Sequence, residues 1–224
     1  MIDDNTMQVL KNFATINPNI VIEEGSTLRT ISEAKNVVSK SALSVEFPAK
    51  FGIGDLNEFI ATLNLVDQPN LTFSEDYVVI SDSVGRSRIN YYFSDIDVLT
   101  APTQEVKMPE ADVTFELDRD TFSKVRRAAS VLGHSNVSVT NIDNTVFLKV
   151  KDNSDSTSNE FEIAVPGVFT AGDNFNFIFN INNLKMIEGD YEVSISQNLI
   201  SHFVNTKSAI EYWVALEKDS TFNS

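Results

Sequence analysis

Cysteine is absent from this 224-residue sequence, and its absence removes several classes of chemistry. Without thiols the chain has no disulfide, no zinc site with thiolate ligands and no cysteine nucleophile. Histidine is nearly absent too, because His134 and His202 are the only two, lie far apart and lack the paired spacing of an acid–base site. No glycine-rich phosphate-binding motif or nucleophile elbow occurs. We therefore expect no enzymatic activity, no metal site and no cofactor.

Long hydrophobic runs are missing as well. No apolar stretch approaches the roughly 18 residues that a membrane span needs. Met1 is followed by Ile-Asp-Asp-Asn rather than by the basic and apolar segments of a signal peptide. We therefore expect no membrane association and a cytoplasmic location. A hydrophobic content of 42% with 16 phenylalanines nevertheless indicates a folded core, and the length suits one large domain or two of about 100–120 residues.

Positive charge is scarce. The chain has 17 lysines and arginines against 32 aspartates and glutamates, and its formal net charge is −15. Such a chain repels nucleic acid at long range, so any contact with nucleic acid must be local or enforced by topology. Yet four of the basic residues lie in one stretch, residues 118–132: Arg119, Lys124, Arg126 and Arg127.

This basic stretch has the pattern of an amphipathic helix. Its apolar residues recur at helical spacing from Phe122 to Leu132 and share one face. Asp118 is a candidate N-cap, and Gly133 is a candidate stop. The basic residues lie opposite or beside the apolar face. On the helix alone, a face that contacts DNA and a face that is simply solvated remain alternatives.

Elsewhere the pattern predicts short helices and many strands. Helices are expected at residues 6–17, 55–65 and 182–187, and strands at residues 20–23, 28–32, 42–47, 71–73, 77–81, 88–93, 113–117, 136–140, 145–150, 161–165, 175–181, 191–196, 200–205 and 209–216, before a polar tail at 217–224. Residues 95–112 contain two prolines and no periodicity, which is typical of a linker. We expect a first domain at residues 1–97, a connector at 98–111 and a second domain at 112–224.

Short sequence segments recur in the same order in the N-terminal and C-terminal halves of the chain. Residues 6–10 match 121–125, residues 19–22 match 136–139, residues 45–48 match 163–166, residues 51–56 match 179–184 and residues 89–92 match 210–213, at offsets between 115 and 128 residues. Alternating Ile, Val and Phe match readily in any β-rich chain, but five ordered matches favour an internal duplication. Each half is then an α+β domain whose antiparallel sheets carry helices on one side.

Six further sequence segments extend this interpretation. They are LKNFATIN at residues 10–17, FNFIFN at 175–180, LKM at 184–186, GDY at 189–191, YWVALE at 212–217 and DST at 219–221. Together they resemble the DNA sliding clamps, in particular those of T4-type bacteriophages, and the resemblance spans the whole chain. It implies an α+β fold with two similar clamp domains per chain. Antiparallel sheets would lie outside and twelve helices inside, in a homotrimeric ring of six domains.

The resemblance also implies a function without catalysis. A sliding clamp is a processivity factor that encircles duplex DNA, independently of its sequence, and tethers the phage DNA polymerase to its template. An ATP-dependent clamp loader would place it on DNA, and late-transcription factors would be further partners. The location implied is the cytoplasm of the bacterial host cell.

The basic helix would then face the hole of the ring. The expected DNA-facing residues are Lys11, Arg119, Lys124, Arg126, Arg127 and Lys185. A sequence-blind slider needs point-charge contacts to phosphates rather than base contacts. The predicted helix at residues 55–65 has no cation and carries Asp55 and Glu58. We therefore expect an uneven inner surface in which residues 118–132 supply most of the positive charge.

The resemblance further implies a hydrophobic pocket under the connector, into which partners insert a short apolar and aromatic peptide. By position it would draw on Val98, Leu99, Ala101 and Pro102 of the connector, on Trp213, Ala215 and Leu216 of the last predicted strand, and on Ile31 and Val37 of the first domain. For Trp213 and Leu216 the alternative is an ordinary core position.

One rival function belongs to a different class. A monomeric, phage-encoded acidic protein that mimics DNA would block a host protein that binds nucleic acid. Such a mimic needs acidic residues spread over an outer face and no oligomer. A clamp needs a trimer and cations gathered on helices.

Overall fold

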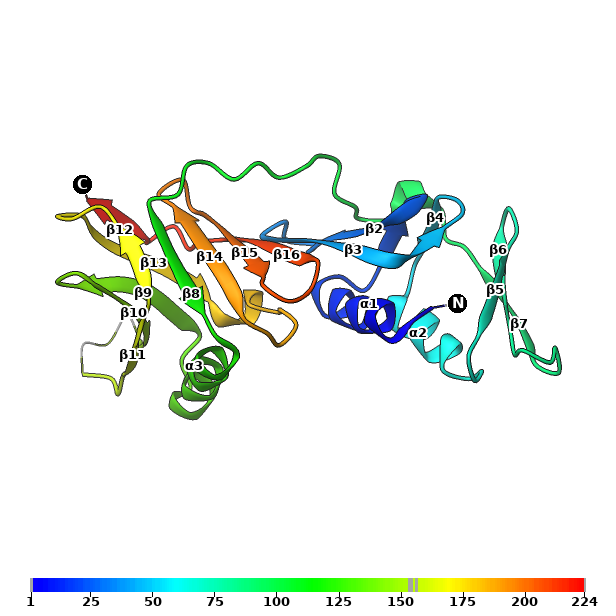
Figure 1. Cartoon of the computed structure of the whole chain (residues 1–224), viewed down its shortest axis with the longest axis horizontal. Coiled ribbons are helices and arrows are strands. Elements are labelled where there is room, and N and C mark those ends of the chain that lie inside the picture. Colours follow the sequence, from blue (N-terminus) through cyan, green and yellow to red (C-terminus); the bar gives the residue numbers. More distant parts are fainter. Residues whose placement is uncertain (1, 153–154, 156, 224) are drawn as a thin grey trace. The chain divides into compact units, whose positions relative to one another are not determined.

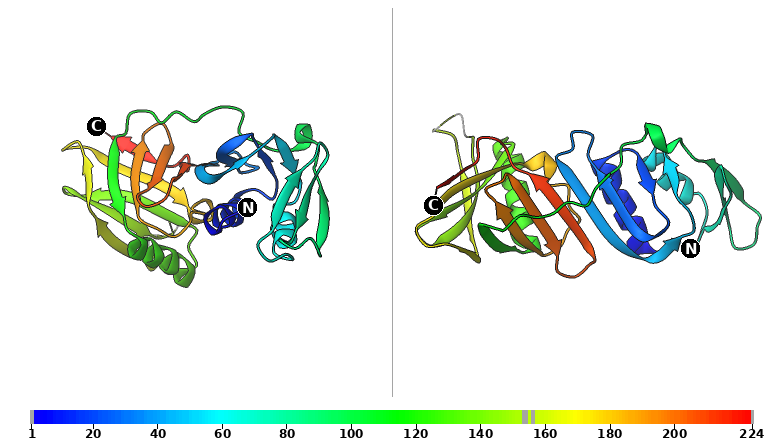
Figure 2. Two further views of the ribbon diagram at one scale, coloured as in Figure 1. Left: turned by 45° about the vertical axis from the view of Figure 1, so that its right-hand side comes forward. Right: turned by 90° about the horizontal axis from the view of Figure 1, so that it is seen from above.

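The computed structural model describes residues 2–152, 155 and 157–223 and divides the chain into two compact units (Figure 1). Unit 1 comprises Met1–Glu105 and unit 2 comprises Val106–Ser224. Antiparallel strands dominate both units, and in each unit taken by itself the α-helices lie on one side of the strands (Figures 1 and 2). Among the described residues, no helix is long and apolar enough to cross a membrane.

Unit 1 begins with a helix that Asp3 caps, because the Asp3 carboxylate accepts a hydrogen bond from the Thr6 amide at 2.7 Å. Its elements are α1 (Asp4–Ile16), β1 (Ile20–Ile22), β2 (Gly25–Ile31), β3 (Val37–Phe47), β4 (Phe51–Ile53), α2 (Leu56–Leu63), β5 (Asn70–Phe73), β6 (Tyr77–Ser81), β7 (Arg88–Tyr92) and the 3-10 helix η1 (Ile96–Val98). Strands β1 and β4 pair, β2 pairs with β3, and β5, β6 and β7 form a meander. The two helices pack together, and Leu10 and Phe13 of α1 and Phe59 of α2 are buried.

Unit 2 contains one long helix and two sets of strands. Its elements are β8 (Val113–Leu117), α3 (Arg119–Leu132), β9 (Asn136–Ile142), β10 (Thr145–Val150), β11 (Phe161–Val165), β12 (Gly167–Phe169), β13 (Asn174–Asn180), the 3-10 helix η2 (Ile181–Asn183), β14 (Tyr191–Ser196), β15 (Ile200–Asn205), β16 (Ile210–Ala215) and β17 (Thr221–Asn223). One set has the order β11-β10-β9-β13-β17, and the other has the order β12-β8-β14-β15-β16. Helix α3 packs on β9, β10 and β11.

The same order of elements and of strand pairs recurs in the two units. Strands β1 and β4 pair as β9 and β13 do, β2 and β3 pair as β10 and β11 do, and the β5-β6-β7 meander corresponds to β14-β15-β16. The first matched pair of segments lies on helices α1 and α3, and the other four overlap corresponding strands of this repeat. The structure therefore supports an internal duplication, to which unit 2 adds β8, β12 and β17.

The helix predicted at residues 182–187 is wrong. Only the three-residue 3-10 helix η2 forms there, because nearby side chains satisfy the backbone of this segment. The Ile187 amide donates to the Tyr212 hydroxyl at 3.2 Å, and the Tyr191 hydroxyl donates to the Ile187 carbonyl. Within the described residues each chain therefore has three α-helices, and the twelve helices expected for a ring reduce to nine.

Several strands were missed or begin earlier than predicted. Strand β4 was not predicted, and β2 begins at Gly25, three residues before the predicted start. Strand β3 begins at Val37, five residues before the predicted start. Residues 167–169 form β12, and the supposed polar tail contains β17, which pairs with β13. The Phe222 ring stacks on Phe177 at 6.0 Å between centroids, so one aromatic side chain in a polar segment brings the tail onto the sheet.

Helix α3 is bounded as its sequence predicts. The Asp118 carboxylate accepts a hydrogen bond from the Thr121 amide at 2.8 Å, and Gly133 ends the helix with a φ of 71° in the left-handed region. A glycine tolerates this conformation because it has no Cβ. Phe122, Val125 and Ala129 are buried beneath the helix.

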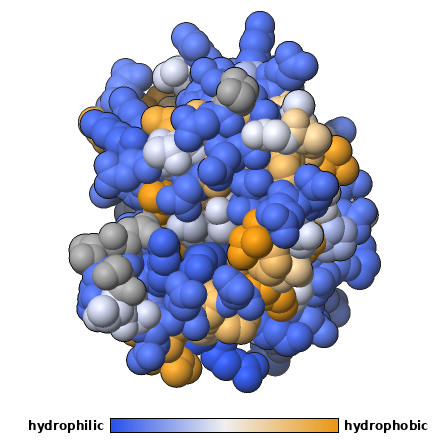
Figure 3. Space-filling model, turned by 90° about the vertical axis from the view of Figure 1, so that its left-hand side faces the viewer, coloured by the Kyte–Doolittle hydropathy of each residue, from blue (hydrophilic) through white to orange (hydrophobic). Residues whose placement is uncertain are grey.

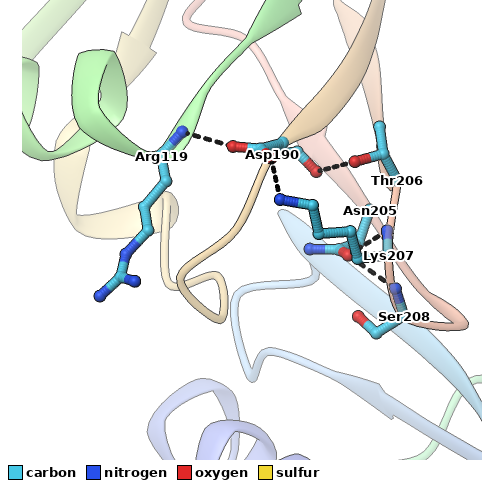
Figure 4. A network of polar contacts seen from close by, with 6 residues as sticks. All are labelled: Arg119, Asp190, Asn205, Thr206, Lys207 and Ser208. Carbon is cyan, nitrogen blue, oxygen red and sulfur yellow. Dashed lines mark hydrogen bonds and ion pairs between the residues drawn. The ribbon is translucent and has the colours of Figure 1, made fainter.

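A second carboxylate fixes the start of α3 to the rest of unit 2 (Figure 4). Asp190, just before β14, accepts a hydrogen bond from the Arg119 amide at 2.9 Å and forms an ion pair with Lys207 at 2.6 Å. The Asp190 carbonyl accepts the Thr206 amide at 3.0 Å. The first turn of α3, the start of β14 and the β15–β16 turn are therefore held together by one residue.

The face of the molecule drawn in Figure 3 is mostly hydrophilic, with hydrophobic side chains among the hydrophilic ones. The exposed large apolar side chains of unit 2 are Val131, Ile142, Val168 and Val204. Scattered apolar residues of this kind are normal on a folded protein, since polar atoms cannot cover the whole surface.

We predict that Asp118→Ala destabilises the protein by about 1 kcal/mol, because the Thr121 amide loses its capping partner. For a chain of this size that corresponds to a fall in Tm of about 2–4 °C, measurable by calorimetry. Ser130→Ala, on the exposed side of the same helix, is the matched control. An equal loss in the control would contradict the capping role.

Stability should also fall in acid through the two carboxylates at this helix start. The Thr121 amide holds the pKa of Asp118 below its usual value, and the Lys207 side chain does so for Asp190. A lowered pKa in the folded state adds stability above the ordinary carboxyl pKa of about 4, and that stability is lost as the pH falls further. Tm measured from about pH 5 to pH 2 should fall less steeply in the double variant D118N/D190N. An unchanged slope would refute this assignment.

Candidate nucleic-acid interface

Helix α3 carries the largest positive charge of any helix in the described chain. It contains four bases and one acid, a net charge of +3, whereas α1 has one of each and α2 has only Glu58. Arg119, Lys124, Arg126 and Arg127 are all exposed. The buried face of the helix packs on the sheet, so its cations project into solvent as one surface, which we call the basic face.

The four cations of the basic face differ in what holds them. Arg119 forms an ion pair with Glu188 at 2.5 Å, and the Arg126 guanidinium lies over the Phe122 ring at 5.6 Å from its centroid. Lys124 and Arg127 have no carboxylate partner among the described residues. These two are therefore the cations most readily available to an outside anion.

A hollow of about 340 Å³ lies beside the basic face. Its lining from α3 consists of Arg119, Asp120, Phe122, Ser123 and Arg126, and the loop before β14 adds Glu188 and Gly189. This hollow and the loop residues around it had no signal in the sequence, because Glu188 lies 69 residues from its partner Arg119. The loop is an element of the site that sequence reasoning missed.

The two remaining sequence-predicted cations lie elsewhere. Lys185 is exposed between the buried side chains of Leu184 and Met186, after η2 rather than within a helix. Lys11 is the single base of α1 in unit 1 and is also exposed. The exposed surface of α2 presents no cation. Within unit 1 the helices are therefore close to neutral or acidic.

The start of the connector is fixed to unit 1 by two asparagines. Asn17 is fully buried and donates to the carbonyls of Ile31 at 2.7 Å and Thr100 at 3.4 Å. The Asn19 side chain accepts the Thr100 amide at 3.1 Å. Further along, Arg29 donates to the Gln104 carbonyl at 2.6 Å. Sequence reasoning missed these anchors, since they lie 75–83 residues from the carbonyls and amide that they bind.

The apolar residues expected to line a partner pocket have different environments in unit 1. Val98 is 76% exposed, whereas Val37 is 3% exposed and belongs to the core. Leu99 packs closely over Gly52, where any side chain in place of the glycine hydrogen would collide with it. Ile31, Ala101 and Pro102 are half-buried.

The unit 2 members of that set are divided in the same way. Trp213 and Ala215 alternate outward on β16 and are half-buried, while Leu216 is buried and its amide bonds to the Leu199 carbonyl. The His202 ring stacks on Trp213 at 4.6 Å with an interplanar angle of 5°, and its Nε2 lies 2.8 Å from a Glu211 carboxylate oxygen. The outer face of β16 thus carries an aromatic pair that the sequence analysis did not connect.

Metal ligands are not gathered anywhere in the described part of the chain. No group of three or more histidines, aspartates or glutamates there has an arrangement able to hold a metal ion. The arrangement observed is instead a basic helix face on a strongly acidic chain, which is suited to point-charge contact with phosphates.

Comparisons with known proteins agree over nearly the whole chain. The family described as "DNA polymerase processivity factor" matches residues 3–98, and the family described as "gp45 sliding clamp, C terminal" matches residues 114–218. A sliding clamp of Vibrio phage KVP40 is 31% identical over 221 residues, covering 96% of this chain and 98% of that protein. The sliding clamp of Enterobacteria phage T4 is 28% identical and covers 97% of this chain and 96% of that protein.

The fold has a solved counterpart at much lower sequence identity. The crystal structure of proliferating cellular nuclear antigen from Entamoeba histolytica aligns with a TM-score of 0.67 at 13% identity, covering 94% of each chain. This likeness confirms the expected sliding-clamp fold. Together with the near-complete coverage of the phage relatives, it establishes that the chain belongs to the sliding-clamp family of DNA polymerase processivity factors.

Proposed function

We propose that this protein encircles duplex DNA as a homotrimeric ring and tethers a phage DNA polymerase to its template. The trimeric ring is the known assembly of this family, whose members are non-enzymatic processivity factors. The observation that carries the proposal is the concentration of cations on α3 in a chain of net charge −15. A ring lined by three copies of the basic face would contact phosphates without reading bases.

The proposed DNA-facing residues remain Lys11, Arg119, Lys124, Arg126, Arg127 and Lys185. Among them we assign the main contacts to Lys124 and Arg127, because both are exposed and have no carboxylate partner in the described chain. Unit 1 adds little, since Lys11 is the only base on its two helices. The three α3 helices therefore supply most of the positive charge of the hole.

The acidic remainder of the chain serves the same mechanism. Three copies of a chain with net charge −15 carry −45, so the ring would bind DNA poorly from free solution. Encirclement would hold it on DNA without many contacts. Few contacts also preserve sliding, because each neutralised phosphate adds affinity and salt dependence.

We assign partner binding to the connector, proposed at residues 98–111, and to apolar residues of both units. The proposed pocket residues are Val98, Leu99, Ala101, Pro102, Trp213, Ala215, Leu216, Ile31 and Val37. Of these, Val98 is the most exposed, and Trp213 and Ala215 are outward on their strand. An aromatic or apolar side chain of the polymerase, the clamp loader or a late-transcription factor would insert here. An ATP-dependent loader would open the ring, in the cytoplasm of the bacterial host.

The decisive test of encirclement compares circular with linearised DNA. Clamp loaded onto a nicked circle should remain after gel filtration and should be lost once a restriction enzyme cuts the circle, because a topological link ends at a free end. Light scattering at micromolar concentration should give a trimer. Equal retention on cut and uncut DNA, or a monomer that binds a host nucleic-acid protein, would favour the acidic mimic instead.

Reversing the main cations should weaken loading and sliding without disrupting the ring. For K124E/R126E/R127E we expect the dependence of DNA binding on salt to flatten by about 0.9 for each phosphate that the variant no longer neutralises, while light scattering still gives a trimer. The control K35E/K107E/K218E changes the net charge equally at exposed sites outside α3. If the α3 variant no longer forms the trimer, the basic face is a subunit interface rather than a surface that binds DNA.

A further inference from the structure

The loop before β14 places one carboxylate directly on the basic face. Glu188 Oε2 lies 2.5 Å from Arg119 Nη2, and the side chains of both residues are about two-thirds exposed, at 68% and 65%. The carboxylate of Glu188 thus forms an ion pair with Arg119 on α3, the helix to which we assign DNA contact. Two flexible side chains can meet by chance, whereas an ion pair between backbone segments that are fixed to each other is part of the fold.

The backbone around Glu188 is held on both sides. Before it, the amide of Ile187 bonds to the Tyr212 hydroxyl and the carbonyl of Ile187 accepts the Tyr191 hydroxyl. After it, Asp190 binds the Arg119 amide and Lys207. Glu188 therefore lies in a segment whose position relative to α3 is fixed.

Gly189 makes this segment tighter still. A Cβ built on Gly189 would collide with the side-chain nitrogen of Asn205. Asn205 is itself 8% exposed and accepts hydrogen bonds from the amides of Lys207 and Ser208. A larger residue at position 189 would require Asn205 to shift, so the loop packs closely on the end of β15 next to Glu188.

The amides at the helix start are not the target of an outside anion. Asp118 accepts the Thr121 amide, and Asp190 accepts the Arg119 amide (Figure 4). Figure 4 also shows the Arg119 side chain extending away from Asp190. Three residues of α3, Arg119, Ser123 and Arg126, line the hollow of about 340 Å³ that Glu188 and Asp120 border. Because these three residues are four and three positions apart, they follow one another along two turns of α3.

We propose that Glu188 is an internal competitor for DNA phosphate, which neutralises Arg119 and lowers the number of phosphate contacts that each subunit makes. This inference rests on the proposed function and deepens it. The pair is exposed, so a DNA phosphate can displace Glu188, but only by giving up the existing ion pair. Arg119 then adds little net affinity, and the ring remains mobile on DNA while Lys124 and Arg127 guide the backbone.

Arg119 and Arg126 therefore have different roles, although the sequence does not distinguish them. Arg126 is held over Phe122 and has no carboxylate partner among the described residues, so it is available to a phosphate in the hollow. Arg119 is available only when Glu188 is removed or displaced. Glu188 is thus a positioning residue that sets the strength of the DNA contact.

A double-mutant cycle on the full-length trimer tests this proposal. Binding to a short linear duplex with open ends, which needs no loader, is measured by fluorescence anisotropy across a series of KCl concentrations. Glu188→Gln should lower the Kd for duplex DNA by up to about five-fold for each Arg119 side chain released from its ion pair. It should also steepen the slope of log K against log salt concentration by about 0.9 for each additional phosphate contact. Arg119→Gln should change wild-type binding little, but it should abolish the gain when combined with Glu188→Gln.

Glu192→Gln is the matched control, since Glu192 is exposed on the outward side of β14 and loses the same charge. A gain in E188Q no larger than in E192Q would mean that only net charge matters and would overturn the proposal. An equal loss of DNA affinity from Arg119→Gln in the wild type and in the Glu188→Gln variant would also overturn the proposal. If wild type and E188Q both fail to bind duplex and to stay on circular DNA, the proposed function falls and this inference falls with it. Wild-type retention on circles together with an additive cycle overturns only the role of Glu188.

Discussion

Two carboxylates at the first turn of α3 are the interaction on which the candidate site depends. Asp118 caps the helix from within, and Asp190 binds the Arg119 amide from the start of β14 while pairing with Lys207. Both groups are charged at neutral pH and lie where the helix dipole favours negative charge. They orient the helix through its backbone, and Lys124 and Arg127 on its exposed face keep no carboxylate partner among the described residues. A helix end satisfied by protein carboxylates also does not compete with those side chains for a phosphate.

The charge distribution follows a simple physical requirement for a sliding ring. A protein that holds DNA by topology needs enough positive charge to align the backbone and too little to stop movement, because each additional phosphate contact increases affinity and salt sensitivity. The chain meets this with a net charge of −15, a single strongly basic helix and helices in unit 1 that are close to neutral or acidic. The Glu188–Arg119 pair adjusts the same quantity within the basic helix, and the fixed loop around Gly189 ensures that the adjustment is the same in every copy.

The two units share one order of helices and paired strands but differ in the lengths of these elements. These differences show which elements could be predicted from the sequence. Alternating apolar residues and helical spacing identified the repeat, α3 and most strands, because those signals come from which face is buried. The approximate place of η2 was also identified, but its length was not. Tyr191 and Tyr212 satisfy the Ile187 backbone from two other strands, and this competition is invisible in the local pattern. Strand β17 was missed for a similar reason, since Phe222 acquires its role only by stacking on Phe177.

The fold class, the family resemblance, the capping of α3 by Asp118 and Gly133 and the concentration of cations between residues 119 and 127 could all be predicted from the sequence. These properties reside in residue type and short-range spacing, which the linear chain displays directly. Which of those cations already have a partner depends on the tertiary structure, because Glu188 lies 69 residues from Arg119 and Asp190 lies 71 residues from it. The same holds for the anchors of the connector, where Asn17 and Asn19 bind Thr100 more than 80 residues away. Pairing across such separations depends on how strands and loops fold back on one another, and no local pattern encodes it.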